Sequence, residues 1–153
     1  MSQPNALEHL IDLAQKQSDE RVKRLADALK RESSNDKRLQ LLIDYRRDYW
    51  KAFEAAQRTG LSAAALINYH HFLQKLDAAV EQQQQTLEHA KASSASARVA
   101  FSEAERRRQS LVSLKDRRAA AARVVEARKD QRRQDEVSQR ISQHGTGVDR
   151  SDK

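Results

Sequence analysis

The sequence predicts an all-α fold, an antiparallel two-helix coiled-coil hairpin in which the second helix is longer and overhangs the first. Three observations favour this fold. Only 3 Gly and 1 Pro occur in 153 residues, and Gly60 is the one among them that lies far from both ends. The stretches on either side of Gly60 consist mostly of Ala, Leu, Gln, Glu, Lys and Arg, which are good helix formers. Both stretches also carry apolar residues at alternating steps of three and four, the spacing of a coiled-coil seam.

The first helix is expected at residues 5–57, with Asn5 as its N-terminal cap and Glu8 in capping-box spacing. From Val22 onward, steps of three and four predict the seam positions Val22, Leu25, Leu29, Glu32, Asp36, Leu39, Ile43, Arg46, Trp50 and Phe53. Four earlier positions join this series only through one extra residue, a stutter: Leu7, Ile11, Ala14 and Ser18. The seam of the first helix is therefore predicted to be interrupted once.

The hairpin turn is expected at residues 58–62, because Gly60 suits the left-handed position after a helix and Ser62 suits the cap of the next one. The second helix is expected at residues 63–141. Its predicted seam loses its regularity near residue 115 and consists of Tyr69, Leu73, Leu76, Val80, Gln83, Leu87, Ala90, Ser94, Ala97, Phe101, Ala104, Arg108 and Leu111.

A short turn forces the two helices to run antiparallel, so that residue 5 lies opposite about residue 115 and residues 116–141 extend past the first helix. We therefore expect one antiparallel coiled-coil domain over residues 1–141. The polar segment 142–153 holds two Gly and is expected to be a disordered tail.

Several classes of protein are disfavoured by composition. The chain has no Cys, which excludes disulfides, thiolate metal sites and a thiol nucleophile. Three glycines cannot build a phosphate-cradling loop, and the adjacent His70 and His71 have no carboxylate or further His four residues away. We therefore expect no enzyme, no cofactor and no metal. No apolar run could span a bilayer, so a cytosolic protein without direct membrane insertion is expected.

Aromatic residues gather around the expected turn, where six of the seven fall within residues 45–72. Leu42, Tyr45 and Tyr49 form a stripe beside the predicted seam, and Phe72, Leu76 and Ala79 form another on the facing helix. A two-helix coiled coil needs only one apolar stripe per helix. The surplus indicates a docking patch for a partner or the seat of a third helical element.

Positive charge is concentrated near the end of the second helix. Residues 98–141 carry 13 Lys+Arg and 7 Asp+Glu, which accounts for +6 of the net charge of +7. The pattern is compatible with a solvated helix face, with nucleic-acid binding, or with entry of a basic arm into an acidic protein cavity. No aromatic residues alternate with these arginines to stack on bases, which weakens the nucleic-acid hypothesis.

Motifs on both sides of the turn resemble the FliJ family of flagellar export proteins. The resemblance rests on Leu41-Leu42-Ile43-Asp44-Tyr45 with Tyr49, and on Ile67-Asn68-Tyr69 with Phe72 and Leu76. Near the N-terminus, Ala6-Leu7-Glu8 and Asp12-Leu13-Ala14 fit the same pattern, as does Asp130-Gln131 late in the chain. The resemblance implies a non-enzymatic, stalk-like component of the flagellar type III export apparatus.

Three partners follow from this resemblance: the hexameric flagellar export ATPase, the cytoplasmic linker of the transmembrane export-gate protein, and export chaperones. It also implies a location at the cytoplasmic face of the inner membrane. By position, the gate-docking residues, here called the apex patch, are Leu42, Tyr45, Tyr49, Phe72, Leu76 and Ala79. The charge pattern, rather than the resemblance, assigns ATPase-ring binding to Arg117, Arg118, Arg128, Lys129, Arg132 and Arg133.

Two alternative functions stay open on the sequence. One is the equivalent stalk of a virulence injectisome, which would work by the same mechanism in a different machine. The other is a basic coiled coil that binds nucleic acid.

Overall fold

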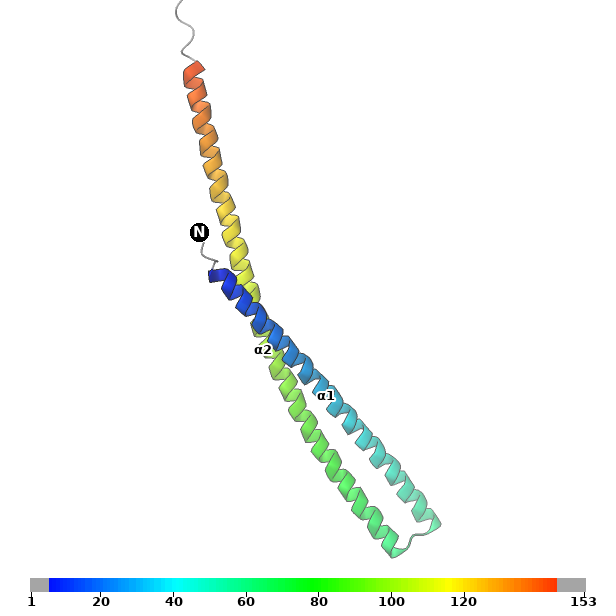
Figure 1. Ribbon diagram of the computed structural model, residues 1–153. Helices are drawn as coiled ribbons and strands as arrows, with labels where there is room; N and C mark the ends of the chain where they lie inside the picture. The colour runs from blue at the N-terminus through cyan, green and yellow to red at the C-terminus, as the bar shows by residue number, and fades with distance from the viewer. Residues whose placement is uncertain (1–5, 146–153) are drawn as a thin grey trace, which may run out of the picture. The chain divides into compact units, whose positions relative to one another are not determined.

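The described part of the chain, residues 6–145, consists of two α-helices and contains no strand. In the computed structural model, α1 spans Ala6–Thr59 and α2 spans Ala63–Gly145, with 54 and 83 residues (Figure 1). Contacts between them run in opposite directions along the chain, from Ser18 with Glu105 to Tyr49 with Phe72. The predicted all-α antiparallel hairpin with a longer second helix is therefore confirmed. No helix in residues 6–145 is apolar over a length sufficient to cross a bilayer.

The turn forms as the sequence predicted. Gly60 has a φ of 96°, in the left-handed region that a residue with a Cβ rarely adopts. The Ser62 hydroxyl accepts a hydrogen bond from the Ala65 backbone amide at 3.2 Å, and the Leu66 amide donates to the Ser62 carbonyl at 3.0 Å. These bonds satisfy amides that the first turn of α2 would otherwise leave without a partner.

Helix boundaries differ from the expected ones mainly at the C-terminal side. Helix α2 continues through residues 142–145, which the sequence analysis assigned to a disordered tail. That assignment is wrong for these four residues, because a single glycine near a helix end costs only about 1 kcal/mol and does not force termination. The predicted cap Asn5 and the remainder of the predicted tail, residues 146–153, lie outside the described residues.

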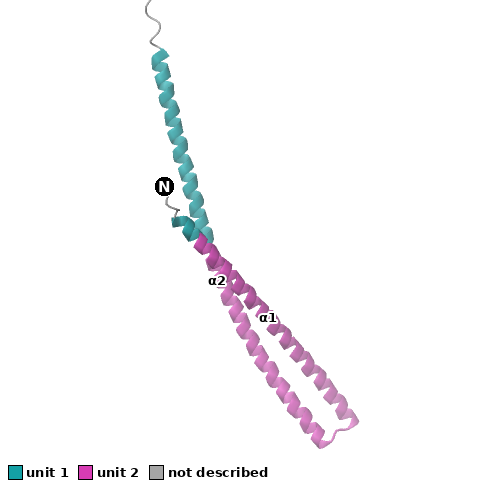
Figure 2. Cartoon of the chain, viewed as in Figure 1, with its two compact units in different colours: residues 1–11, 108–153 teal, residues 12–107 magenta. Residues whose placement is uncertain are grey.

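The chain divides into two compact units, which share both helices (Figure 2). Unit 2 consists of residues 12–107 and contains the turn. Unit 1 combines the chain before residue 12 with the chain after residue 107, of which residues 6–11 and 108–145 are described.

In unit 2, α2 packs with the seam that its sequence predicted. Every predicted seam position from Tyr69 to Ala104 is buried or half-buried, and the most buried are Leu73, Leu76, Val80, Leu87 and Ser94. The alternating three- and four-residue steps are those of a coiled coil.

The seam of α1 is different from the predicted one, although half of its positions agree. Ile43, Asp44 and Ala56 are half-buried, and the regular series of buried and half-buried residues of α1 in unit 2 is Ala14, Ser18, Leu25, Ala28, Glu32, Asn35, Leu39, Leu42, Arg46, Tyr49 and Phe53. This series keeps its three- and four-residue steps from Ala14 to Phe53 if the exposed Arg21 is counted, so the predicted stutter is wrong. Val22, Leu29, Asp36 and Trp50, all predicted to lie in the seam, are exposed.

The physical reason is that packing across the hairpin outweighs the size of individual apolar side chains. At two positions the larger apolar residue, Leu29 or Trp50, was assigned to the seam, whereas its neighbour Ala28 or Tyr49 lies there. Tyr49 packs its ring 4.4 Å from that of Phe72, measured between centroids. The inward series of α1 therefore stays in step with α2 at the cost of leaving large apolar side chains outside.

Polar side chains in the seam of unit 2 are paired across it. The Ser18 hydroxyl donates to the Glu105 carboxylate at 2.7 Å, and the Gln83 amide donates to the Asn35 side-chain oxygen at 3.1 Å. The Ser94 hydroxyl likewise donates to the Glu32 carboxylate. No buried side-chain N or O atom of the described residues lacks a partner. Such pairs fix the alignment of two helices more than they stabilise them.

The described residues of unit 1 form one short paired stretch and one long exposed helix segment. Leu7 is buried in it, and the Lys115 ammonium lies 3.6 Å from the Glu8 carboxylate. From Ser113 to Gly145 every residue is exposed. The side chains of this segment therefore lie largely in solvent.

Candidate functional site

The apex patch lies in unit 2, where aromatic rings from α1 and α2 interleave. The Phe72 ring centroid is 4.4 Å from that of Tyr49 and 6.1 Å from that of Tyr45. Tyr49 also packs against Tyr69 at 5.3 Å. Offset and edge-on ring pairs at such distances add to the stabilisation that burial alone provides. The rings are thus held in place before any partner binds.

The structure brings the six predicted patch residues together but does not expose them equally. Tyr45 is 52% exposed and forms the open part of the patch. Half-buried positions are held by Leu42, Tyr49, Phe72 and Ala79. Leu76 is only 6% exposed and belongs to the core, so a partner on this surface would not reach much of it. The sequence analysis had placed Leu76 both in the seam and in the patch, and burial supports the seam.

The electrostatic character of the patch is that of a neutral surface. Partial removal from water raises the pKa of the Tyr49 phenol, and the neighbouring Tyr69 and Tyr45 raise it further. Because a raised pKa favours the protonated form, Tyr49 stays uncharged at physiological pH. The patch therefore offers aromatic surface and phenolic hydroxyls but no charge of its own.

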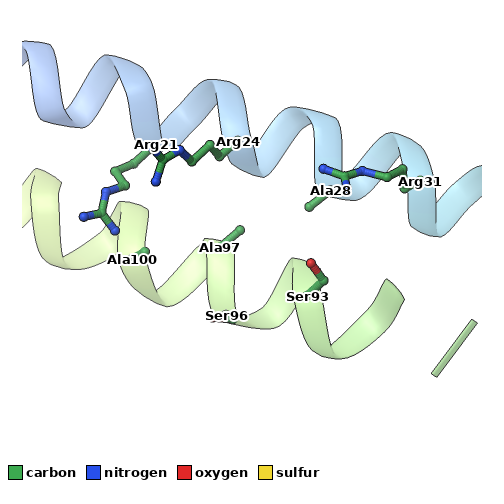
Figure 3. A pocket seen from close by; sticks show the side chains of 8 residues that line it. All are labelled: Arg21, Arg24, Ala28, Arg31, Ser93, Ser96, Ala97 and Ala100. Carbon is green, nitrogen blue, oxygen red and sulfur yellow. The ribbon is translucent and has the colours of Figure 1, made fainter. Parts of the chain in front are cut away.

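Away from the turn, the same side of unit 2 changes from aromatic to cationic. A groove of about 380 Å³ lies between α1 and α2 and is shown in Figure 3. Three arginines and Ala28 line it from α1, and small residues line it from α2: Arg21, Arg24, Arg31, Ser93, Ser96, Ala97 and Ala100. The side chain of Arg21 extends toward Ala100, whereas those of Arg24 and Arg31 lie along α1. The groove contains no carboxylate and would favour an anionic group.

The six basic residues predicted to bind the ATPase ring lie in the exposed segment of unit 1, residues 113–145. We call residues 116–145 the basic arm. All six are exposed, and at about 100° per residue they fall within roughly 160° of the helix circumference. Arg133 lies 3.8 Å from the Asp130 carboxylate, an exposed pair that weakens its charge little. One side of the arm is therefore strongly cationic.

Sequence reasoning missed three exposed apolar residues close to the turn. Leu41 is 68% exposed, Ile67 is 57% exposed and Trp50 is 48% exposed. Trp50 could have been found by continuing the spacing of Leu7 and Ala14 through α1 without a stutter, which places Tyr49 inside and Trp50 outside. For Leu41 and Ile67 the helical spacing offered no comparable signal.

No group of three or more His, Asp or Glu side chains within residues 6–145 is arranged to hold a metal ion. What these residues present instead is surface: an aromatic patch, a cationic groove and a basic arm on long helices. Such a fold and such surfaces define a coiled-coil protein of the interaction class.

Comparison with known proteins identifies the family. The family model described as "Flagellar FliJ protein" matches residues 2–147. The chain is 34% identical to the Flagellar FliJ protein of Salmonella typhi over 142 residues. The alignment covers 93% of this chain and 97% of that protein. It is also 30% identical to the Flagellar FliJ protein of Escherichia coli strain K12. That alignment likewise spans 142 residues, 93% of this chain and 97% of the relative. The chain belongs to the FliJ family, and the resemblance seen in its sequence is confirmed.

Proposed function

We propose that this protein is a stalk-like coupling element of the flagellar export apparatus, the machine in which the FliJ family is a component. The observation that carries the proposal is that each of the two units has a surface of different chemistry. The apex patch in unit 2 is aromatic and neutral, whereas the basic arm in unit 1 is cationic and exposed along its whole length. Each surface suits a different partner, as coupling requires.

The basic arm is proposed to enter the hexameric flagellar export ATPase. A single helix whose residues are exposed on all sides can be enclosed by a ring of subunits. The cations Arg117, Arg118, Arg128, Lys129, Arg132 and Arg133 would meet acidic residues of the ring, where low dielectric strengthens attraction between opposite charges. Binding there would promote assembly and turnover of the ATPase.

ATPase turnover tests this part of the proposal. We expect saturating amounts of the protein to raise the hydrolysis rate of its cognate export ATPase. The double variant Arg128→Glu/Arg132→Glu should lose this stimulation. A matched control, Lys16→Glu/Lys75→Glu, changes two exposed lysines of unit 2 by the same charge and should retain it. Equal stimulation of the ATPase by both double variants would show that the basic arm is not part of the interface.

The apex patch is proposed to dock on the cytoplasmic linker of the transmembrane export-gate protein. Tyr45, Tyr49 and Phe72 form its aromatic centre, with Leu42 and Ala79 beside them. Aromatic residues held rigidly on a surface are typical anchors of protein interfaces. Leu76 would support this surface from the core rather than contact the partner.

Binding to the isolated gate linker tests this assignment. We expect Phe72→Ala to weaken binding by at least about tenfold, as the loss of an interface anchor does, while the helical circular dichroism signal is retained. The control Ile67→Ala removes an apolar side chain that is 57% exposed and lies outside the patch. If Phe72→Ala and Ile67→Ala bound equally well, the gate would dock elsewhere.

Escort of export chaperones and a location at the cytoplasmic face of the inner membrane complete the proposed role. The location follows from the same two partners, whereas escort adds the chaperones as a third, and membership of the FliJ family supports both. The competing nucleic-acid hypothesis makes a separate prediction: nanomolar DNA binding that persists at about 200 mM salt. Such binding would overturn the export role.

A further inference from the structure

A row of apolar side chains runs along α1 outside the seam. Val22, Leu29, Ile43 and Trp50 occur at multiples of seven residues, and we call them the flank stripe. Val22 is 41% exposed, Leu29 is 38% exposed and Trp50 is 48% exposed, whereas Ile43 is half-buried. All four lie in unit 2, and none belongs to the apex patch.

A stripe of this spacing has a specific meaning in helix packing. A helix with one partner needs apolar residues only at the two seam positions of each seven-residue repeat. A helix packed against two neighbours carries apolar residues at a third position of the repeat as well. The flank stripe supplies that third position in four of five consecutive repeats. In the remaining repeat, the middle one, Asp36 occupies it. In unit 2, α1 therefore has the pattern of a helix with a second neighbour.

The two stripe residues nearest the turn line a groove between α1 and α2. Ile43, Trp50 and Leu73 form its apolar part, and its volume is about 650 Å³. Its two carboxylates are already engaged: Asp77 lies 3.3 Å from Arg46, and Glu54 accepts a hydrogen bond from the Trp50 indole at 2.9 Å. Arg47 and Lys51 also line the groove. Arg47 is likewise paired, at 3.7 Å from Asp44 and 3.4 Å from Asp48, so the lining side chains that stay available to an incoming partner are apolar apart from Lys51.

Lysines accompany the stripe along its length. Lys23, Lys30, Lys37 and Lys51 each follow a stripe position by one residue, counting Asp36, whereas Ile43 is followed by Asp44, which is paired with Arg47 at 3.7 Å. All four are exposed, and none forms a salt bridge or a side-chain hydrogen bond within residues 6–145. A second copy of this chain would bring the same four lysines to face these four. The charges therefore favour a partner that is acidic rather than a second copy.

We propose that the flank stripe, Val22, Leu29, Ile43 and Trp50, is the docking site for an amphipathic α-helix of a partner protein. The helix presents an apolar stripe to these four residues and acidic residues to Lys23, Lys30, Lys37 and Lys51. Together with α1 and α2 it forms a local three-helix bundle. This site is distinct from the apex patch and from the basic arm, and it does not depend on either of their proposed partners.

Trp50 allows a direct test, because it is the only tryptophan in the chain and belongs to the stripe. Two synthetic helical peptides of four seven-residue repeats would be titrated into the full-length protein. Both carry the same Leu and Ile stripe, and the flanking positions are Glu in one peptide and Lys in the other. We expect the Glu peptide to shift Trp50 emission to shorter wavelength and to protect it from iodide quenching, and the Lys peptide to leave it unchanged.

Two sets of variants make the test specific. Leu29→Ser should weaken binding of the Glu peptide by at least about tenfold, as loss of one buried leucine contact does. The control Leu41→Ser removes a leucine that is 68% exposed and lies off the stripe, and it should have no effect. Lys23→Glu/Lys30→Glu/Lys37→Glu should reverse the preference in favour of the Lys peptide, whereas Lys16→Glu/Lys75→Glu should not.

Three results would overturn the proposal. The first is equal binding of the two peptides, which would indicate non-specific apolar contact. The second is an unchanged preference in the triple lysine variant. The third is a Trp50 shift that appears on raising the protein concentration without peptide, which would assign the stripe to a second copy of the chain.

Discussion

Within unit 2, the half of the seam next to the turn and the half farther from it hold the two helices together in different ways. Near the turn, Phe53 is buried with its ring 5.2 Å from that of Tyr69 and 5.4 Å from that of His70. Farther away, small residues such as Ala28 and Ala97 alternate with the paired polar residues Glu32 and Ser94. The same seven-residue repeat thus contains most of the large rings in one half, whereas in the other half small and polar side chains stand among Leu25, Leu87 and Phe101.

The difference separates two tasks that a coiled coil must perform. Large apolar rings supply stability, because the free energy of burial grows with the apolar area removed from water. Paired polar side chains contribute little net stability, but they penalise any sliding of one helix along the other. We therefore expect the aromatic half to determine how stable unit 2 is, and the polar half to determine its alignment.

The largest effect is expected from Phe53→Ala in the aromatic half. Phe53 is 3% exposed, and truncation would leave a cavity among Trp50, Tyr69 and His70. Loss of a buried Phe side chain typically costs about 3–5 kcal/mol of unfolding free energy. Urea unfolding followed by circular dichroism at 222 nm measures this cost.

Leu41→Ala serves as the control, because Leu41 is an exposed leucine of the same helix and should change the unfolding free energy by less than about 0.5 kcal/mol. A loss below about 1.5 kcal/mol for Phe53→Ala would contradict the assignment of stability to the aromatic half.

The sequence predicted the seam of α2 better than the seam of α1. The two helices, the turn at Gly60 and the seam of α2 were predictable, because few residues break the helices and apolar residues occupy most seam positions of α2. The seam of α1 was not, because adjacent residues compete for it: Leu29 is larger than Ala28, and Trp50 is larger than Tyr49. Only the facing residues of α2 decide between such neighbours.

The candidate site was predictable to a similar degree. The residues that gather around Tyr45 and Phe72 could be chosen from their spacing and their resemblance to a family. Their accessibility could not, because Leu76 lies one turn from Phe72 and is nevertheless buried. The flank stripe could not be recognised either, since its members had been assigned to the seam.

An intermediate effect is expected from the polar half at Asn35 and Gln83. The Gln83 amide donates to both the side-chain and the backbone oxygen of Asn35, each at 3.1 Å. The single variant Gln83→Leu removes the donor and should cost about 1–2 kcal/mol, because it leaves the Asn35 side-chain oxygen partly desolvated without a donor, while the Asn35 amide nitrogen still donates to the Arg31 carbonyl. The double variant Asn35→Leu/Gln83→Leu should recover this loss or exceed wild-type stability.

Urea unfolding of the two variants and the wild type measures these differences. If the double variant were less stable than Gln83→Leu alone, the polar pair would be a source of stability and not chiefly of alignment.

The smallest effect is expected from the ion pair between Arg46 and Asp77, which lies in the aromatic half. The two charged groups are 3.3 Å apart, but their side chains are 39% and 65% exposed, so water screens the attraction. Exposed pairs contribute about 0.2–1 kcal/mol, and less as salt rises.

A double-mutant cycle of Arg46→Gln and Asp77→Asn, measured in urea at about 50 mM and about 500 mM NaCl, gives the coupling energy. We expect about 0.5 kcal/mol or less at the lower salt concentration and almost none at the higher, because screening shortens the range of the interaction. A coupling energy above about 1.5 kcal/mol that persisted in salt would mean that charge, and not ring packing, holds this half of unit 2 together.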